Sequence, residues 1–281
     1  MTQVPTMPAR AATGAAPTES TVANGLVFDH VSHWYVSDKE ARLVVEDLDF
    51  TVPDGQFLAI VGGSGCGKTT ALNMVAGLIK PTEGTVTARI DGEALSLPSP
   101  RLGYMWARDT LLPWRSLQRN VEFGLEVRGV ARARRAEQAR RYIEMVGLKG
   151  NEKKFPRQLS HGMRQRGNLA RLLAIEPGFL LMDEPFSALD AQTKGVMQQE
   201  FLQIWEQDRR TVVYVTHDLT EAALLADRVL VMGQGYLAYD IPIPFERPRT
   251  LDELRFSTEF AELNRYLYDR LMDAQKGGRA A

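Results

Sequence analysis

The chain has a single cysteine, Cys66, among its 281 residues, so it cannot form an internal disulfide. It also lacks any run of the roughly 18 to 20 consecutive apolar residues that a helix needs to cross a bilayer. Its first two dozen residues contain no apolar segment of the kind that a secretory signal requires. Together these absences predict a cytoplasmic protein in a reducing compartment.

Neither sign of charge is in excess. The chain has 34 Lys and Arg against 35 Asp and Glu, a formal net charge of −1. Sequence-independent binding to nucleic acid depends on a basic surface that neutralises phosphates, so we expect no nucleic acid as the main ligand. The 44% content of hydrophobic residues is typical of one ordinary globular domain or two small ones.

The order of sequence patterns indicates an α/β protein. Residues 1–24 are small, polar and interrupted by proline, which predicts a disordered tail. Apolar, β-rich runs then alternate with helical stretches, which is typical of a parallel sheet; the expected strands are 26–31, 42–52, 56–61, 85–90, 179–183, 211–217 and 228–232. We expect a helical insert at about 106–175 and, over 241–281, a C-terminal extension that is mainly helical.

A glycine-rich segment follows the strand expected at 56–61. Gly62, Gly67, Lys68 and Thr69 fit the phosphate-loop pattern, in which curled backbone N–H groups and a helix N-terminus face the phosphates. Lys68 is expected to hold the β- and γ-phosphates of a nucleoside triphosphate and Thr69 to bind Mg²⁺. The expected binding residues are Gly62, Gly63, Ser64, Gly65, Cys66, Gly67, Lys68, Thr69 and Thr70. Cys66 itself is not expected to be catalytic.

Two carboxylates follow the apolar strand expected at 179–183. Parallel strands present their carboxyl ends to the ligand crevice, so Asp183 and Glu184 are expected beside the phosphates. Asp183 would help to organise Mg²⁺. Glu184 would orient and polarise the attacking water, because phosphoryl transfer needs positioning and charge stabilisation more than covalent help.

Residues 159–166, LSHGMRQR, predict a helix whose N-cap is Ser160, and a capped helix start attracts anions. With LLMDEPFSALD and VTHD in this order, the chain resembles the ATP-binding cassette (ABC) family of transporter ATPases from about residue 26 to 239. The resemblance implies a P-loop NTPase fold over 25–240. This fold has a RecA-like core sheet, an N-terminal antiparallel β subdomain and a helical subdomain.

The same resemblance implies how the site is assembled. Two cassettes meet head to tail around two ATP molecules with Mg²⁺, so that Lys68, Glu184 and His217 are the catalytic residues of one copy. The resemblance also implies contacts with nucleotide from the seam between the copies, made by Ser160, Gly162, Met163 and Asp190. Tyr35, or alternatively Trp34, is placed to stack on the adenine, and His217 is the switch histidine near the γ-phosphate.

The motifs depart from the family pattern at two positions. Where the family has a glutamine that reaches Mg²⁺ and water, this chain has Ala107, whose methyl group cannot coordinate or accept a hydrogen bond. We expect slower or more loosely coupled turnover as a result. His161 replaces the first signature glycine, and its side chain either points away from the phosphate or contributes a polar contact there.

Two stretches of the sequence indicate the class of cassette protein. The residues LLPW and VTHDLTEAALLADRV are similar to those of nitrate, sulfonate and taurine importer ATPases. That similarity implies separate membrane permease subunits, one of whose short helices docks into a groove on the helical insert. It also implies a solute-binding protein and a peripheral location on the cytoplasmic face of the cell membrane.

Three matters remain open from the sequence. The partner cassette is either an identical copy or a different chain. A soluble cassette protein of translation or DNA repair is an alternative, although such proteins usually have two cassettes or a long coiled-coil insertion. A phosphate-loop kinase is a weaker alternative, because kinases do not need a segment such as LSHGMRQR that completes the ATP site of a second copy.

Overall fold

The computed structural model describes residues 24–36 and 41–277, so nearly all of the predicted disordered tail lies outside the described residues. The chain forms two compact units. Unit 1 contains the residues up to Leu95 and those from Val215 onward, and unit 2 contains Ser96–Tyr214. Among the described residues, none of the helices combines the length and the apolar character that crossing a bilayer requires.

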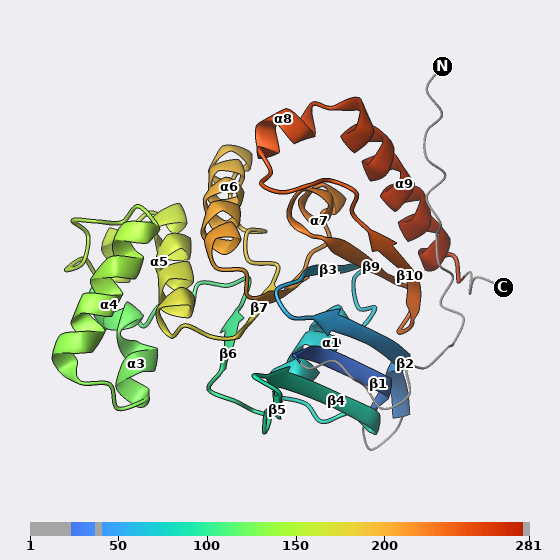
Figure 1. The fold of residues 1–281 in the computed structure, drawn as a ribbon, viewed down its shortest axis with the longest axis horizontal. Helices are drawn as coiled ribbons and strands as arrows, with labels where there is room; N and C mark the ends of the chain where they lie inside the picture. The colour runs from blue at the N-terminus through green and yellow to red at the C-terminus, as the bar shows by residue number, and fades with distance from the viewer. Residues whose placement is uncertain (1–23, 37–40, 278–281) are drawn as a thin grey trace. The chain divides into compact units, whose positions relative to one another are not determined.

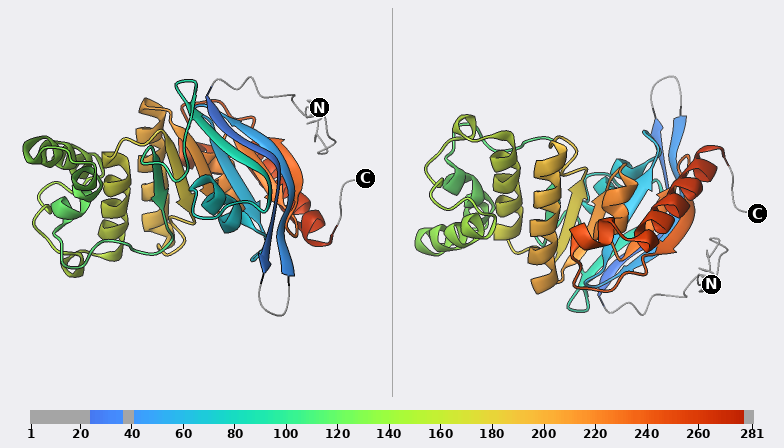
Figure 2. Two further views of the ribbon diagram at one scale, coloured as in Figure 1. Left: turned by 90° about the horizontal axis from the view of Figure 1, so that it is seen from below. Right: turned by 90° about the horizontal axis from the view of Figure 1, so that it is seen from above.

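The first sheet of unit 1 is antiparallel and has the strand order β2-β1-β4-β5. Its long strands are β1 (Gly25–Val36), β2 (Ala41–Pro53) and β4 (Glu83–Ile90), and β5 covers only Glu93–Ala94. Figure 2 shows the long strands side by side as a twisted sheet. Phe28 pairs with Phe50 across β1 and β2, and their rings stack at 4.4 Å, which anchors one face of this sheet.

The second group of strands in unit 1 carries the loop of interest. In β3 (Phe57–Gly62) all six residues are buried, as expected of a strand covered on both faces. Parallel to β3 lies β9 (Arg228–Met232), which pairs antiparallel with β10 (Leu237–Pro242). The helices of this unit are α1 (Lys68–Val75), α7 (Leu219–Leu225), α8 (Leu251–Arg255) and α9 (Thr258–Gln275).

Helix α9 gives the C-terminal segment a fixed place within unit 1. Ser257 caps it by accepting a hydrogen bond from the Phe260 amide. The leucines at 263, 267 and 271 recur every four residues and are buried, which gives the helix one apolar face. With α7, it packs on β3, as Figure 1 shows.

Unit 2 contains three strands in the order β8-β7-β6. Strand β7 (Phe179–Asp183) runs parallel to β6 (Leu102–Met105), and β8 covers Thr211–Val215. After β7 the chain enters α6 (Ala191–Gln207). Phe186, which is fully buried before α6, contacts the rings of Phe201 and Tyr214, so the turn after β7 is anchored in an aromatic core.

The remaining helices of unit 2 pack around α5 (His161–Ala174). They are α2 (Leu117–Val121), α3 (Phe123–Val127) and α4 (Arg132–Met145), and a short 3₁₀ turn covers Pro156–Gln158. Ser116 and Ser160 cap α2 and α5 by accepting hydrogen bonds from backbone amides in the first turns. The N-cap predicted at Ser160 is therefore confirmed.

Candidate functional site

The backbone of the phosphate loop requires glycine at specific points. Gly65 and Gly67 have φ of +75° and +101°, in the left-handed region that favours glycine. A Cβ at Gly67 would lie 2.7 Å from the Val44 carbonyl oxygen, and one at Gly62 would lie 2.6 Å from the Cys66 sulfur. The loop can adopt this curled form because Gly67 has no side chain to collide with β2, and Gly62 has none to collide with Cys66 of the same loop.

Lys68 begins helix α1 and is 7% exposed. Its ammonium donates hydrogen bonds to the carbonyl oxygens of Gly62 (2.9 Å) and Gly63 (2.8 Å), so the loop backbone holds the positive charge in place. Ser64 and Thr69 are exposed, and no acidic residue lies in the first turn of α1. The N-terminus of α1 therefore offers positive potential and donors without a neighbouring negative side chain.

Cys66 lies inside this loop and is buried. Burial raises the pKa of its thiol, and the nearby Lys68 ammonium, 3.8 Å from the sulfur, opposes that rise. The thiol is therefore mainly protonated at neutral pH, as expected of a residue without a catalytic role.

His217 and Tyr35, also in unit 1, lie on segments that border the loop. The amide of Thr216 donates to the carbonyl of Ile60 in β3 (3.2 Å), which places the next residue, the exposed His217, beside the end of that strand. Tyr35 is 47% exposed and pairs with Arg42, two residues before the Val44 carbonyl that approaches Gly67. Its ring meets that of His33 edge to face at 4.9 Å.

Asp183 and Glu184 lie in unit 2 at the carboxyl end of β7. Glu184 has φ of +48°, an uncommon value for a residue with a side chain, so the chain turns sharply there. Ser187 secures the turn by donating from its hydroxyl to the Glu184 carbonyl oxygen (2.9 Å). Burial, and secondarily the negative charge of Asp183, raises the pKa of Tyr104 in β6.

The signature segment begins at Ser160, which is exposed and accepts from the amide of Met163 (3.3 Å). A Cβ at Gly162 would lie 2.9 Å from the methyl group of Thr193, so the start of α5 contacts the first turn of α6. Asp190 caps α6 by accepting from the Thr193 amide (3.0 Å), which lowers the pKa of Asp190. Unit 2 thus places the predicted residues Gly162 and Asp190 close together.

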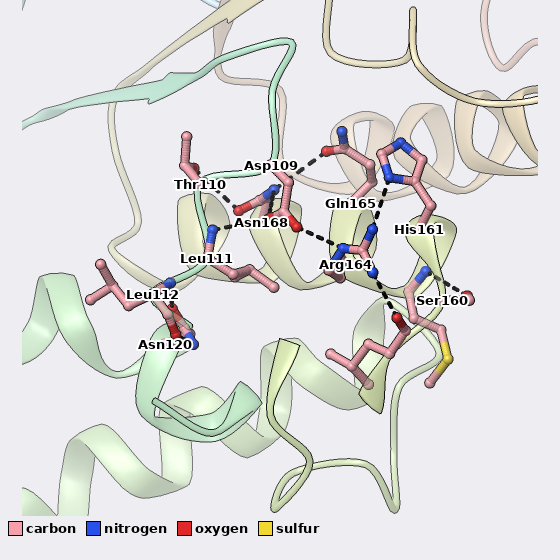
Figure 3. A network of polar contacts seen from close by, with 12 residues as sticks. Asp109, Thr110, Leu111, Leu112, Asn120, Ser160, His161, Arg164, Gln165 and Asn168 are labelled. Atoms are coloured by element: carbon pink, nitrogen blue, oxygen red, sulfur yellow. Dashed lines mark hydrogen bonds and ion pairs between the residues drawn. The ribbon is translucent and has the colours of Figure 1, made fainter. Parts of the chain in front are cut away.

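The two departures from the family pattern, Ala107 and His161, belong to one polar network. Figure 3 shows the part of it around His161 and Arg164. The carbonyl oxygen of Ala107 accepts from the side chain of Gln165 (3.3 Å). The Arg164 guanidinium lies 3.4 Å from His161 Nδ1, and because a guanidinium only donates, that nitrogen is the acceptor. The proton of a neutral His161 is therefore on Nε2, which is buried and has no hydrogen-bond partner among the described residues.

Sequence reasoning missed the other members of this network. Asp109 forms an ion pair with Arg164 (2.7 Å) and accepts from Asn168, and Arg171 donates to the Thr110 carbonyl oxygen (2.8 Å). The signal was present, because positions 164, 168 and 171 fall on one face of a helix. No sequence signal indicated that Gln275 of α9 lies 3.4 Å from where a Cβ at Gly63 would be.

The predicted site residues thus fall into two groups. Unit 1 contains the phosphate loop, Tyr35 and His217. Unit 2 contains Asp183, Glu184 and Asp190, together with the signature residues Ser160, Gly162 and Met163.

Comparison with known proteins identifies the family. The profile described as ABC transporter matches residues 45–187. An uncharacterized ABC transporter ATP-binding protein of Methanocaldococcus jannaschii is 44% identical over 82% of this chain and 84% of its own length. The bicarbonate transport ATP-binding protein of Synechocystis (93% and 94% covered) and the nitrate import ATP-binding protein of Synechococcus elongatus (90% and 94%) are each 38% identical.

A solved structure gives the same result. A dimeric ATP-binding cassette in a post-hydrolysis state, bound to ADP and Pi, has a TM-score of 0.69 and 29% identity, covering 79% of this chain and 100% of its own. The predicted α/β fold of a phosphate-loop cassette is confirmed. The chain therefore belongs to the ABC transporter family, as one of its ATP-binding subunits, which are ATPases.

Proposed function

We propose that the chain is the ATP-hydrolysing subunit of an importer and works as a dimer of cassettes around two ATP molecules. In each site, Lys68 and the phosphate loop come from one copy, and Ser160, Gly162 and Met163 come from the other. Asp190 lies at the seam between the copies. The relative solved as a dimer with ADP and Pi supports this arrangement.

The observation that carries the proposal is the seating of Lys68. Its ammonium is fixed by two backbone carbonyls at the start of α1, where the glycine backbone leaves room for phosphate oxygens. A positive charge fixed before the nucleotide binds costs little reorganisation when the γ-phosphate arrives. We place the adenine on the exposed ring of Tyr35.

The residues proposed to hold Mg²⁺ fit that ion chemically. Thr69 presents a hydroxyl in the first turn of α1, and Asp183 a carboxylate at the end of β7, and oxygen ligands are the ones Mg²⁺ prefers. When bound, the ion would neutralise charge on the β- and γ-phosphate oxygens.

We assign to Glu184 the role of orienting and polarising the attacking water, and to His217 a contact with the γ-phosphate. The turn at Glu184 is held by Ser187 and by the buried Phe186, and this fixed turn supports a proton-accepting role for its carboxylate. The backbone bond from Thr216 to Ile60 fixes the segment that carries His217 beside β3.

A pocket in unit 2 supports docking of a membrane permease. Its volume is about 520 Å³. Two exposed aromatic rings and four arginines line it, together with Ser116 and Glu126; the rings are those of Trp114 and Phe155, and the arginines are Arg115, Arg119, Arg132 and Arg135. Trp114 is 71% exposed. Such a pocket suits a short segment with an acidic residue and an apolar side chain. An R132E variant should therefore lose permease on co-purification but keep its affinity for ATP.

The cargo we propose is a small anionic solute of the nitrate, sulfonate or taurine kind, delivered by a solute-binding protein. The named relatives, for nitrate and for bicarbonate, support a small anion. The cassette would then lie peripherally on the cytoplasmic face of the cell membrane.

The proposal is tested with the full chain and an E184Q variant. Wild type should release phosphate from ATP and E184Q should not, while ATP and Mg²⁺ should shift E184Q to twice its monomer mass in light scattering. An S160A variant should bind ATP with unchanged affinity but fail to dimerise. Glu184-independent phosphate release, or co-purification with ribosomes instead of membrane proteins, would contradict the proposal.

A further inference from the structure

Arg164 contacts the residues on both sides of Ser160, the serine of the LSHGMRQR segment. Its guanidinium donates to the carbonyl oxygen of Leu159 (2.8 Å), directly before Ser160, and lies 3.4 Å from the ring of His161, directly after it. The two residues that flank the signature serine are thus held by one side chain.

Asp109 is the group that holds Arg164 in that position. Its Oδ2 atom lies 2.7 Å from Arg164 Nε, and the pair is only 26% and 28% exposed. Its Oδ1 atom accepts from the Leu111 amide (3.0 Å) and from Asn168 (3.3 Å), so the carboxylate is fixed from its own loop and from α5. A charge-assisted bond to a carboxylate fixed in this way is stronger and more directional than one to a neutral acceptor.

The loop that carries Asp109 is bound to the same helix along its length. Gln165, which is fully buried, donates to the Ala107 carbonyl oxygen, and Arg171 donates to both the carbonyl and the hydroxyl of Thr110. Polar side chains on successive turns of α5 therefore hold residues 107–110. This loop is the segment in which the family places its glutamine and this chain has Ala107.

We propose that Asp109 is a positioning residue for Ser160, acting through Arg164. The inference rests on the proposed function, because it assumes that Ser160 completes the ATP site of a second copy. Without the carboxylate, the long arginine side chain keeps, among the described residues, a carbonyl and an imidazole nitrogen as acceptors, and its position is less defined. Leu159 and His161 then vary more, and the serine between them meets the γ-phosphate in fewer dimers.

The experiment measures ATPase kinetics of the full chain carrying D109N, D109E, R164Q or both D109N and R164Q. E200Q is the matched control, because it removes an ion pair of the same helix, Arg166 with Glu200 at 3.0 Å, of similar exposure. We expect D109N and R164Q each to lower kcat at least fivefold, with KM for ATP changed less than twofold. D109E should recover at least half of the wild-type kcat, and E200Q should match wild type.

Two readouts separate positioning from a general loss of structure. The affinity for a fluorescent ATP analogue should stay unchanged in D109N, because the phosphate loop belongs to unit 1. D109N should also still melt in one cooperative transition, which shows that it is folded. The double variant should be no slower than the slower single variant, since both changes break one contact.

The outcomes also distinguish this inference from the proposed function. If S160A abolishes turnover while D109N retains the wild-type kcat, the positioning role is wrong and the proposed function stands. If the two single effects multiply in the double variant, Asp109 and Arg164 act independently and the inference is overturned. If wild type itself shows no Glu184-dependent turnover, the proposed function fails first.

Discussion

The left-handed backbone at Glu184 predicts that glycine is more stable than alanine at this position. A residue with a Cβ pays roughly 1–2 kcal/mol in the left-handed region, which glycine avoids. Glycine loses more backbone entropy on folding, which costs about 0.5–1 kcal/mol. Since φ at Glu184 is +48°, E184G should be more stable than E184A by up to about 1.5 kcal/mol.

The comparison between alanine and glycine removes the side-chain contacts of Glu184 from the result, because neither variant has them. Glu137 is the matched control, because it is an exposed residue inside α4. There, glycine should be less stable than alanine by about 0.8–1.0 kcal/mol. The order of the two residues should therefore reverse between positions 184 and 137.

The assay is urea unfolding of the four variants, with the midpoint and slope compared within each pair. Phosphate release should be absent from both variants at position 184, because neither supplies a carboxylate to the water, and normal in both at 137. If E184G is less stable than E184A by as much as E137G is below E137A, the turn at Glu184 is unstrained and the reasoning is refuted.

Two further predictions concern the phosphate loop. A K68A variant should lose at least tenfold in affinity for a fluorescent ATP analogue, measured by equilibrium titration, because no other cation is seated on the Gly62 and Gly63 carbonyls among the described residues. Cys66 should react with iodoacetamide at pH 8 more slowly than glutathione does, because burial raises its pKa and lowers the fraction of thiolate. Saturating ATP should slow the alkylation further, and mass spectrometry of the modified peptide checks both.

Local patterns were sufficient to predict the elements that carry the site. The run 56–61 is apolar throughout, and the glycines that follow leave few backbone alternatives, so the loop and the start of α1 at Lys68 could be predicted. Ser160 likewise caps the helix predicted to follow it.

Contacts between distant segments could not be predicted in the same way. Asp109 and Arg164 are 55 residues apart, and in the sequence an aspartate beside Arg108 is typical of an ordinary loop. The approach of Gln275 to Gly63 depends on how α9 packs on β3, which a helical pattern alone does not specify. Likewise, the positive φ of Glu184 has no residue signature, because glycine is the usual choice there.

The two departures from the family pattern should behave as a coupled pair. Ala107 is held by Gln165 and His161 contacts Arg164, and these two contacting residues are adjacent in α5. A107Q should raise kcat by restoring a polar group near the proposed water, and H161G should release Arg164 from its imidazole contact. Both positions contact the same turn of α5, through Gln165 and Arg164. The effect of A107Q on kcat should therefore differ between wild type and H161G by at least threefold. Phosphate-release kinetics of the four proteins measure this, and equal effects of A107Q in both backgrounds would show that the two positions act separately.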